Sequence, residues 1–316
     1  MHSISRRGFV VSAAAAGAAF GLDGPLEFMM PAFAQAGGPA FVKFKVGDIE
    51  VIQMYDGIWE KAHDPGFVKN ASLDEVKASL KAGGLTDEHV PIPFTITAIR
   101  TGGRLVLFDS GTGAQLMPTA GLIAKNEVMK AAGIDPAEVR TIVITHFHPD
   151  HITGLMAKDT NAPVFPNAEI LVSAAEYKFW TDLATTAGAA KRIQAVFPTW
   201  KNISQFDGDK EVVPGVRAVA TPGHTPGHTS YAMGSGSGQL IVLSDVSNIP
   251  ALFVKNPGWH AAFDGNAVLA ETNRRKIFDR AIADKATVTG YHFGMPGAGT
   301  IAKDGNGYVF TPVKAG

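Results

Sequence analysis

The most constraining feature of the sequence is the stretch Thr145-His146-Phe147-His148-Pro149-Asp150-His151. It places three imidazoles and one carboxylate within six residues, directly after the β-branched run 141–144. A short run of this kind between polar segments predicts a buried strand. A strand that ends there would release four possible metal ligands at its tip, and the rest of the fold would have to bring further ligands to the same place.

Three other polar residues stand in the same position relative to an apolar or β-branched run. The run 219–223 leads into His224, 240–244 leads into Asp245, and 287–291 leads into His292. Functional sites in layered α/β folds gather at strand ends, so we expect these residues to meet the 145–151 stretch. Neutral imidazoles and carboxylates suit zinc, and also iron, manganese or cobalt.

The spacing inside the stretch predicts how it divides. His146 and His148 are two residues apart in an extended segment and therefore project to the same side. Pro149 biases His148 away from helix and suits the first turn of a helix that starts there. Such a turn would swing Asp150 and His151 toward a second centre.

Composition excludes several classes of function. The chain has 316 residues, of which 46% are hydrophobic, so it can bury a large core. Charged residues make up only 18% and the formal net charge is −1, which argues against a broad basic surface for nucleic acid or anionic lipid. The absence of cysteine excludes disulfides, a thiolate zinc site and a cysteine nucleophile.

The remaining sequence predicts strands in runs that are separated by helices. Strands are expected over 41–55, as a hairpin turning at Gly47-Asp48, and over 94–99, 104–108, 168–172, 212–220, 240–243 and 286–289. Helices are expected after the capping boxes at 72–75 and 173–176, over 122–132, and around 277–282. No linker or repeat interrupts residues 37–316, which indicates one domain of sheets with helices on their outer faces.

The sequence pattern of residues 1–36 is typical of an export signal. Ser5-Arg6-Arg7-Gly8-Phe9 is a twin-arginine start, an apolar run to Leu22 follows, and an A-x-A cleavage site fits at Ala34 or Ala36. The apolar run is too short and interrupted to span a bilayer. We expect a periplasmic protein with no membrane anchor after cleavage; the alternative is a cytosolic protein with an alanine-rich N-terminal helix.

The sequence resembles the metallo-β-lactamase fold superfamily in four motifs that occur in the same order within residues 40–300. They are His146-x-His148-x-Asp150-His151, Thr221-Pro222-Gly223-His224-Thr225-Pro226-Gly227-His228, Asp245 after a strand, and Gly290-Tyr291-His292. The resemblance implies an α/β fold in four layers (αββα), with two packed mixed sheets and helices on the outer faces. The sequence looks most similar to the methyl parathion hydrolase and N-acyl-homoserine-lactone lactonase branches, and Pro136 and the aromatic stretch 176–180 favour the former.

The same resemblance implies a dinuclear metal site and assigns each ligand. One metal would be bound by His146, His148 and His224. The second would be bound by Asp150, His151 and His292, with Asp245 bridging the two. The expected cofactors are two divalent ions, with zinc favoured, that share a hydroxide as the nucleophile. Asp150 could also accept a proton as the hydroxide attacks.

Other residues are expected beside the metals. Asp109 ends the strand 104–108 and resembles the buried acid that orients a ligand in the family, while His228 is the second histidine of its motif and is expected to be structural. Trp180 and Phe253 are expected to line an apolar substrate pocket, although large aromatic side chains pack more often in a core. No role is assigned to the lone histidines His63, His89 and His260.

Several functions remain open at this point. The favoured hypothesis is a dinuclear hydrolase of a neutral, apolar ester-type substrate: a phosphotriester such as methyl parathion, a lactone or an aryl ester. A β-lactamase and a thioesterase share the fold, but one second-metal pattern of β-lactamases needs a cysteine. A di-iron redox relative, or a metal-binding protein without catalysis, is the alternative of another class, against which His148 keeps the hydrolase pattern. A small-molecule partner is expected, with a homodimer as one option for assembly.

Overall fold

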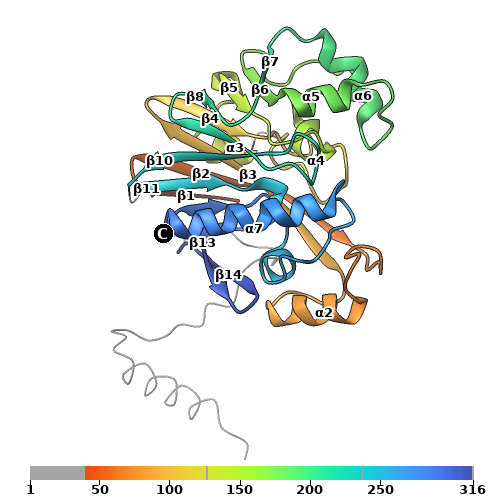
Figure 1. The fold of residues 1–316 in the computed structure, drawn as a ribbon. Helices are drawn as coiled ribbons and strands as arrows, with labels where there is room; N and C mark the ends of the chain where they lie inside the picture. Colours follow the sequence, from red (N-terminus) through yellow and green to blue (C-terminus); the bar gives the residue numbers. More distant parts are fainter. Residues whose placement is uncertain (1–39, 126, 237, 315–316) are drawn as a thin grey trace, which may run out of the picture. The chain divides into compact units, whose positions relative to one another are not determined.

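The computed structural model describes residues 40–125, 127–236 and 238–314, so the predicted leader lies outside the described residues (Figure 1). Within these residues the strands form two sheets of seven strands each. Each sheet follows the order of the chain, β1 to β7 in the first and β8 to β14 in the second. Every strand therefore pairs with its neighbour in sequence.

The first sheet is antiparallel in its first half and parallel in its second. Strands β1 to β4 pair antiparallel, and β4 to β7 pair parallel. Its strands are β1 (Phe41–Val46), β2 (Ile49–Lys61), β3 (Val90–Thr101), β4 (Arg104–Phe108), β5 (Thr141–Val143), β6 (Glu169–Ser173) and β7 (Ile203–Phe206).

The second sheet is antiparallel except where β11 pairs with β12. Its strands are β8 (Glu211–Val213), β9 (Val216–Ala220), β10 (Thr229–Ser235), β11 (Gly238–Val242), β12 (Thr287–Thr289), β13 (Ala298–Asp304) and β14 (Gly307–Pro312).

The helices are short, apart from α7. They are α2 (Leu73–Ala82), α3 (Glu127–Ala131), α4 (Pro149–Ile152), α5 (Ala174–Thr181), α6 (Ala190–Val196) and α7 (Ala267–Ala283), with short 3-10 or π turns at 136–138, 153–155, 197–199, 244–246 and 250–254. None of the helices in the described ranges is long and apolar enough to cross a membrane.

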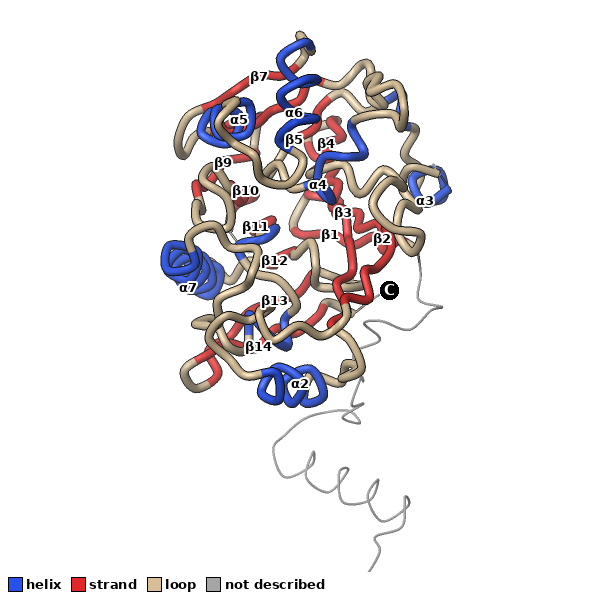
Figure 2. Tube along the Cα trace, turned by 90° about the vertical axis from the view of Figure 1, so that its right-hand side faces the viewer, coloured by secondary structure: helices blue, strands red, loops and turns tan. Residues whose placement is uncertain are grey.

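The elements form four layers, with the two sheets inside and helices outside (Figure 2). Three hydrophobic clusters fill the spaces between these layers. Between the sheets, Phe108 of β4 packs against Tyr231 of β10 with ring centroids 5.5 Å apart. A second cluster joins the first sheet to α3, α5 and α6, and a third joins the second sheet to α7 through Ile277 and Phe278. The predicted αββα arrangement of two mixed sheets is confirmed.

Two local predictions are confirmed in detail. Gly47, at a φ of 58°, turns the hairpin between β1 and β2. Ser72 and Glu75 form a reciprocal capping box at the start of α2, in which the Ser72 amide donates to the Glu75 carboxylate over 2.8 Å. Both devices act over a few residues, and no distant group competes for them.

Several other local predictions are wrong, two of them because a buried acid makes hydrogen bonds that the predicted element does not allow. The expected helix over 122–132 is present only as α3, since Asp56 accepts the amide of Ile123 over 2.8 Å and holds that segment in turns. The expected capping box at Ser173 does not form; α5 begins there, but its N-cap side chain makes no bond and Glu176 is engaged elsewhere. The expected strand 212–220 is two strands that turn at Gly215, whose φ is 82°. Strands β7, β10, β13 and β14 were not expected.

Tyr231 ties the two sheets together next to the predicted ligands. Its ring is buried between the sheets, and its hydroxyl donates over 2.7 Å to the carbonyl of Ile144, just after β5. Burial raises the pKa of Tyr231 well above its usual value, so the phenol stays a donor. This bond fixes the chain immediately before His146.

Replacing Tyr231 with Phe should therefore lower the free energy of unfolding by about 1–3 kcal/mol, because a buried carbonyl loses its donor. Chemical denaturation would measure the change. Tyr308→Phe is the matched control, since the hydroxyl of Tyr308 bonds Asp279 in a partly buried position. Equal losses in the two variants would contradict the role given to the inter-sheet bond.

Candidate metal centre

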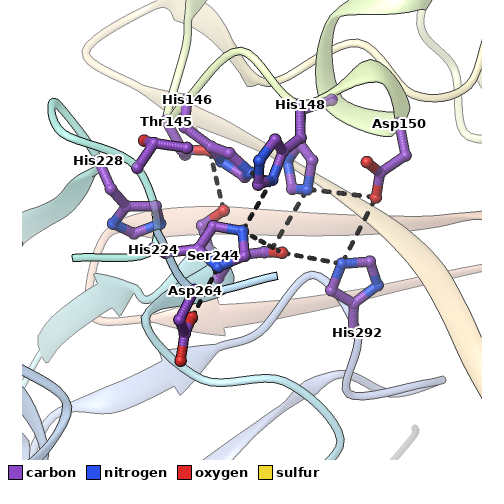
Figure 3. Close-up of polar contacts among 12 residues, drawn as sticks. Thr145, His146, His148, Asp150, His224, His228, Ser244, Asp264 and His292 are labelled. Carbon is purple, nitrogen blue, oxygen red and sulfur yellow. Dashed lines mark hydrogen bonds and ion pairs between the residues drawn. The ribbon is translucent and has the colours of Figure 1, made fainter. Parts of the chain in front are cut away.

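The seven predicted ligands meet where the strands end (Figure 3). His146 and His148 follow β5, and the turn of α4 that begins at Pro149 carries Asp150 and His151, as predicted. The other three arrive from the second sheet, with His224 after β9, Asp245 after β11 and His292 after β12. The site therefore joins the two sheets.

The first group contains three imidazoles. Nδ1 of His148 lies 3.0 Å from Nε2 of His146 and 2.9 Å from Nε2 of His224. Burial, together with neighbouring imidazoles, lowers the pKa of His146 well below its usual value, and burial lowers the pKa of His148 to about 3. Both rings are therefore neutral, which is the form that binds metals.

The second group mixes imidazoles with a carboxylate. Oδ2 of Asp150 lies 3.4 Å from Nε2 of His151 and 3.5 Å from Nε2 of His292. Asp245 reaches both groups, since its Oδ2 is 3.0 Å from Nε2 of His292 and 3.4 Å from Nε2 of His224. Asp245 thus lies between the two groups of ligand atoms.

The donors fit divalent metal ions. Nε2 of His151 and Oδ1 of Asp245 are buried and make no hydrogen bond in the described chain, although they lie 3.3 Å apart. Burial alone would lower the pKa of His151, but neighbouring carboxylates, first that of Asp245, raise it well above its usual value. Several carboxylates thus favour a positive charge at this place, and a bound cation can supply it instead of a proton.

Asp109, which was expected to orient a ligand, bonds His151 of the second group, and its orienting role stays a prediction. Its Oδ2 accepts from Nδ1 of His151 over 2.8 Å, and its Oδ1 accepts from the amide of Thr145 over 2.8 Å. The hydroxyl of Thr145 donates to Asp109 over 2.7 Å and also lies 3.0 Å from Nδ1 of His146. Burial raises the pKa of the Asp109 carboxyl. Thr145 was not predicted to have this role, although it begins the motif.

Asp264 orients His224 and was also missed by the sequence. Its Oδ1 lies 2.9 Å from Nδ1 of His224, and its Oδ2 accepts from Arg274 of α7 over 3.2 Å. Arg274 is itself buried and donates to three backbone carbonyls. His292 is oriented by a carbonyl instead, because its Nδ1 lies 2.8 Å from the oxygen of Pro93.

Two residues beside the ligands hold a backbone conformation that glycine prefers. Asp109 has a φ of 63° and Ser244, immediately before Asp245, has a φ of 51°. Such residues cost about 1–3 kcal/mol each and persist where surrounding bonds hold them. Here the hydroxyl of Ser244 lies 2.8 Å from that of Thr145, so the two strand ends hold each other.

His228 lies beside the first group and outside it. Its Nδ1 is 2.9 Å from the hydroxyl of Thr221, and its ring centroid is 5.2 Å from that of His146. Burial lowers the pKa of His228 to about 3, so this ring is neutral too. His228 therefore lies close to His146, and the structural role expected for it stays a prediction.

The predicted pocket residues are buried. Trp180 stands edge-on to His148 with ring centroids 5.8 Å apart, whereas Phe253 packs in the core against Phe67. Their role as pocket walls stays a prediction. The lone histidines take part in other contacts, as His63 bonds the carbonyl of Asp87 and His260 pairs with Glu271.

The family model described as Metallo-beta-lactamase superfamily matches residues 93–281. The chain belongs to the metallo-beta-lactamase superfamily. An N-acyl homoserine lactonase of Bacillus sp. is 33% identical over 150 residues, which are 47% of this chain and 54% of the relative. The lactonase AttM of Agrobacterium fabrum is 33% identical over 109 residues, 33% of this chain and 39% of the relative. The chain thus spans about half the length, or less, of these curated relatives.

Solved structures of the superfamily are similar over most of the chain. AidC, a dizinc quorum-quenching lactonase in complex with a product, is 25% identical with a TM-score of 0.76, covering 87% of this chain and 98% of AidC. The hydrolase AbOPH is 24% identical with a TM-score of 0.80, covering 88% and 98%. The family match confirms the predicted superfamily, and these likenesses confirm its four-layer fold.

If Asp264 orients His224, Asp264→Asn should lower metal affinity about 10- to 100-fold, because an uncharged amide has one acceptor oxygen and cannot serve both His224 and Arg274. Competition with a chelator would measure the affinity. Asp284→Asn, at the C-terminal end of α7 beside Arg280, is the control and should leave metal binding unchanged. Unaltered affinity in Asp264→Asn would contradict the orienting role.

Proposed function

We propose that the chain is a dinuclear-metal hydrolase that cleaves a neutral, apolar ester-type substrate, with lactones as the favoured class. The observation that carries this proposal is the position of Asp245, whose two oxygens face both groups of ligand atoms. Two groups joined by one carboxylate are the arrangement that two adjacent divalent ions need. A purely structural cluster has no use for a buried oxygen without a partner.

Two divalent cations at these positions, with zinc favoured by the donor set, would supply a water of lowered pKa and polarise the oxygen under attack. The chain's own residues place the reacting groups. Asp150 is the ligand carboxylate with most access to solvent, at 20% of its side chain exposed against 4% for Asp245. Asp150 is therefore the group that could also take up a proton near the entrance.

The surroundings favour a neutral substrate. The buried cation nearest to His224 is Arg274, and its guanidinium is engaged with Asp264 and the carbonyls of Val246, Pro257 and Trp259. It is not available to pair with an anionic substrate. His148 and Asp150 are half-buried, so they mark the open side of the centre, where Trp180 adjoins His148.

The curated relatives support lactones over the other ester types. Those named above are N-acyl homoserine lactonases, and AidC was solved with a product bound. A phosphotriester or an aryl ester would meet the same nucleophile and stays an alternative substrate class. No contact in the described residues favours a β-lactam or a thioester over these.

His148→Ala should remove one of the three imidazoles that define the first group. We expect fewer than two metal ions per chain and a loss of lactone hydrolysis of more than about 100-fold. Loss of a residue that only hydrogen-bonds a ligand already costs about 10- to 100-fold in affinity or activity, and loss of the ligand should cost at least as much. Metal analysis and initial rates on an acyl-homoserine lactone, a paraoxon-type ester and an aryl ester would measure both. His260→Ala, away from the ligands, is the control. Full hydrolysis by metal-depleted His148→Ala would sink the proposal.

We also propose that residues 1–36 direct export to the periplasm through the twin-arginine route. The support is the sequence Ser5-Arg6-Arg7-Gly8-Phe9 and the cleavage sites at Ala34 and Ala36. Replacing Arg6 and Arg7 with Lys should leave the full-length precursor in the cytoplasm, whereas the wild type should yield a shortened periplasmic protein. Cell fractionation with mass determination would decide it, and an uncleaved wild type would contradict it.

A further inference from the structure

Glu176 is a fully buried carboxylate, with none of its surface exposed. Its Oε1 accepts from the amide of Phe147 over 2.8 Å and from Nε1 of Trp180 over 2.6 Å. Its Oε2 accepts from the hydroxyl of Thr225 over 2.7 Å and from the amide of Gly227 over 2.9 Å. Both oxygens are therefore used twice, and all four donors are neutral.

The donors belong to the two loops that carry the first group of ligands. Phe147 lies between His146 and His148, while Thr225 and Gly227 follow His224. One loop follows a strand of the first sheet and the other follows a strand of the second. The carboxylate of Glu176 links them through its hydrogen bonds to both. Its attachment to Phe147 and Thr225 fixes the separation of the three imidazoles.

Close packing supports the same reading. A side chain at Gly227 would place its first carbon 2.1 Å from the backbone nitrogen of Glu176, so this loop lies directly against the start of α5. Trp180, held by Glu176 through its indole nitrogen, stands edge-on to His148. Each of the three ligand residues is therefore next in sequence to a residue that donates a hydrogen bond to Glu176, since His146 and His148 flank Phe147 and Thr225 follows His224.

The second group is held by other residues. His151 bonds Asp109, His292 bonds the carbonyl of Pro93, and the hydroxyl of Tyr291 donates over 2.6 Å to the carbonyl of Asp150. None of the hydrogen bonds that Glu176 makes within the described ranges goes to these residues. The hydrogen bonds of Glu176 thus go to the loops of the first group, whereas Asp109 bonds His151 directly and contacts His146 only through the hydroxyl of Thr145.

We propose that Glu176 is a positioning residue that selectively sets the metal affinity of the three-imidazole half of the centre. The inference rests on the dinuclear site of the proposed function. Glu176 touches neither the ligand atoms nor a substrate, so it acts through the two loops. Its loss would let the imidazoles of one half separate and leave the other half in place.

The test is Glu176→Gln in the full chain. A glutamine has one acceptor oxygen, so in either orientation two of the four donors, both serving one oxygen, lose their acceptor. We expect the ion at the three-imidazole position to be lost about 10- to 100-fold more readily to a chelator than in the wild type. Anomalous scattering from crystals of the partly depleted protein, loaded with zinc alone, should show the loss at the position next to His146, His148 and His224.

Asp56→Asn is the matched control. Asp56 is also a buried carboxylate bonded to neutral donors, the amide and hydroxyl of Thr112 and the amide of Ile123. Its replacement should destabilise the fold without selective loss at the three-imidazole position. Equal depletion of both positions in Glu176→Gln, no depletion, or the same selective loss in Asp56→Asn would each overturn the proposal.

Two milder variants keep the test decisive if Glu176→Gln does not fold. Trp180→Phe and Thr225→Val each remove one donor to Glu176, and each should weaken the same position by a smaller factor. Failure of the proposed function is distinguishable, because wild-type protein would then bind no pair of ions. If the wild type binds two ions and all these variants lose both alike, only the role of Glu176 is wrong.

Discussion

One constraint governs the centre: imidazole nitrogens and carboxylate oxygens lie close together in a buried place. Asp245 is 4% exposed, yet it faces the imidazoles of His151, His224 and His292 and keeps one oxygen without a hydrogen bond. Buried groups of this kind are costly unless a partner satisfies them. The fold therefore has to supply a site for cations and also hydrogen bonds that keep the ligand side chains close together.

Three further buried acids provide those hydrogen bonds, and each bonds a different part of the centre. Asp109 holds His151 and Thr145, Asp264 holds His224, and Glu176 joins the loops of both sheets. Their own charges are compensated in different ways. Asp264 has Arg274, Asp109 has His151, and Glu176 has four neutral donors, so burial raises the pKa of Glu176. Each acid links elements that are adjacent in space and not in sequence.

The sequence predicted which histidines and carboxylates cluster better than it predicted the residues that hold them, and the reason is physical. His146, His148 and Asp245 could be found because each follows an apolar run, and a strand end is a local signal. Asp264 binds a histidine 40 residues away and has no local pattern that marks it. Glu176 did have a local pattern, that of a capping box, but two distant loops offered it four donors and prevailed. In the same way, Asp56 accepts the amide of Ile123 and keeps the first residues of an expected helix out of that helix.

The two groups of ligand residues differ in their exposure to solvent within each group. His146 and His224 are buried, whereas His148 is half-buried and Asp150 has 20% of its side chain exposed. Under the proposed function, a substrate would approach from the side of His148 and Asp150. The second group is held as firmly as the first, because Asp109, the carbonyl of Pro93 and the hydroxyl of Tyr291 bond its members. Buried supports on both sides can therefore keep the ligands of both groups in place while one side of the centre stays open to a substrate.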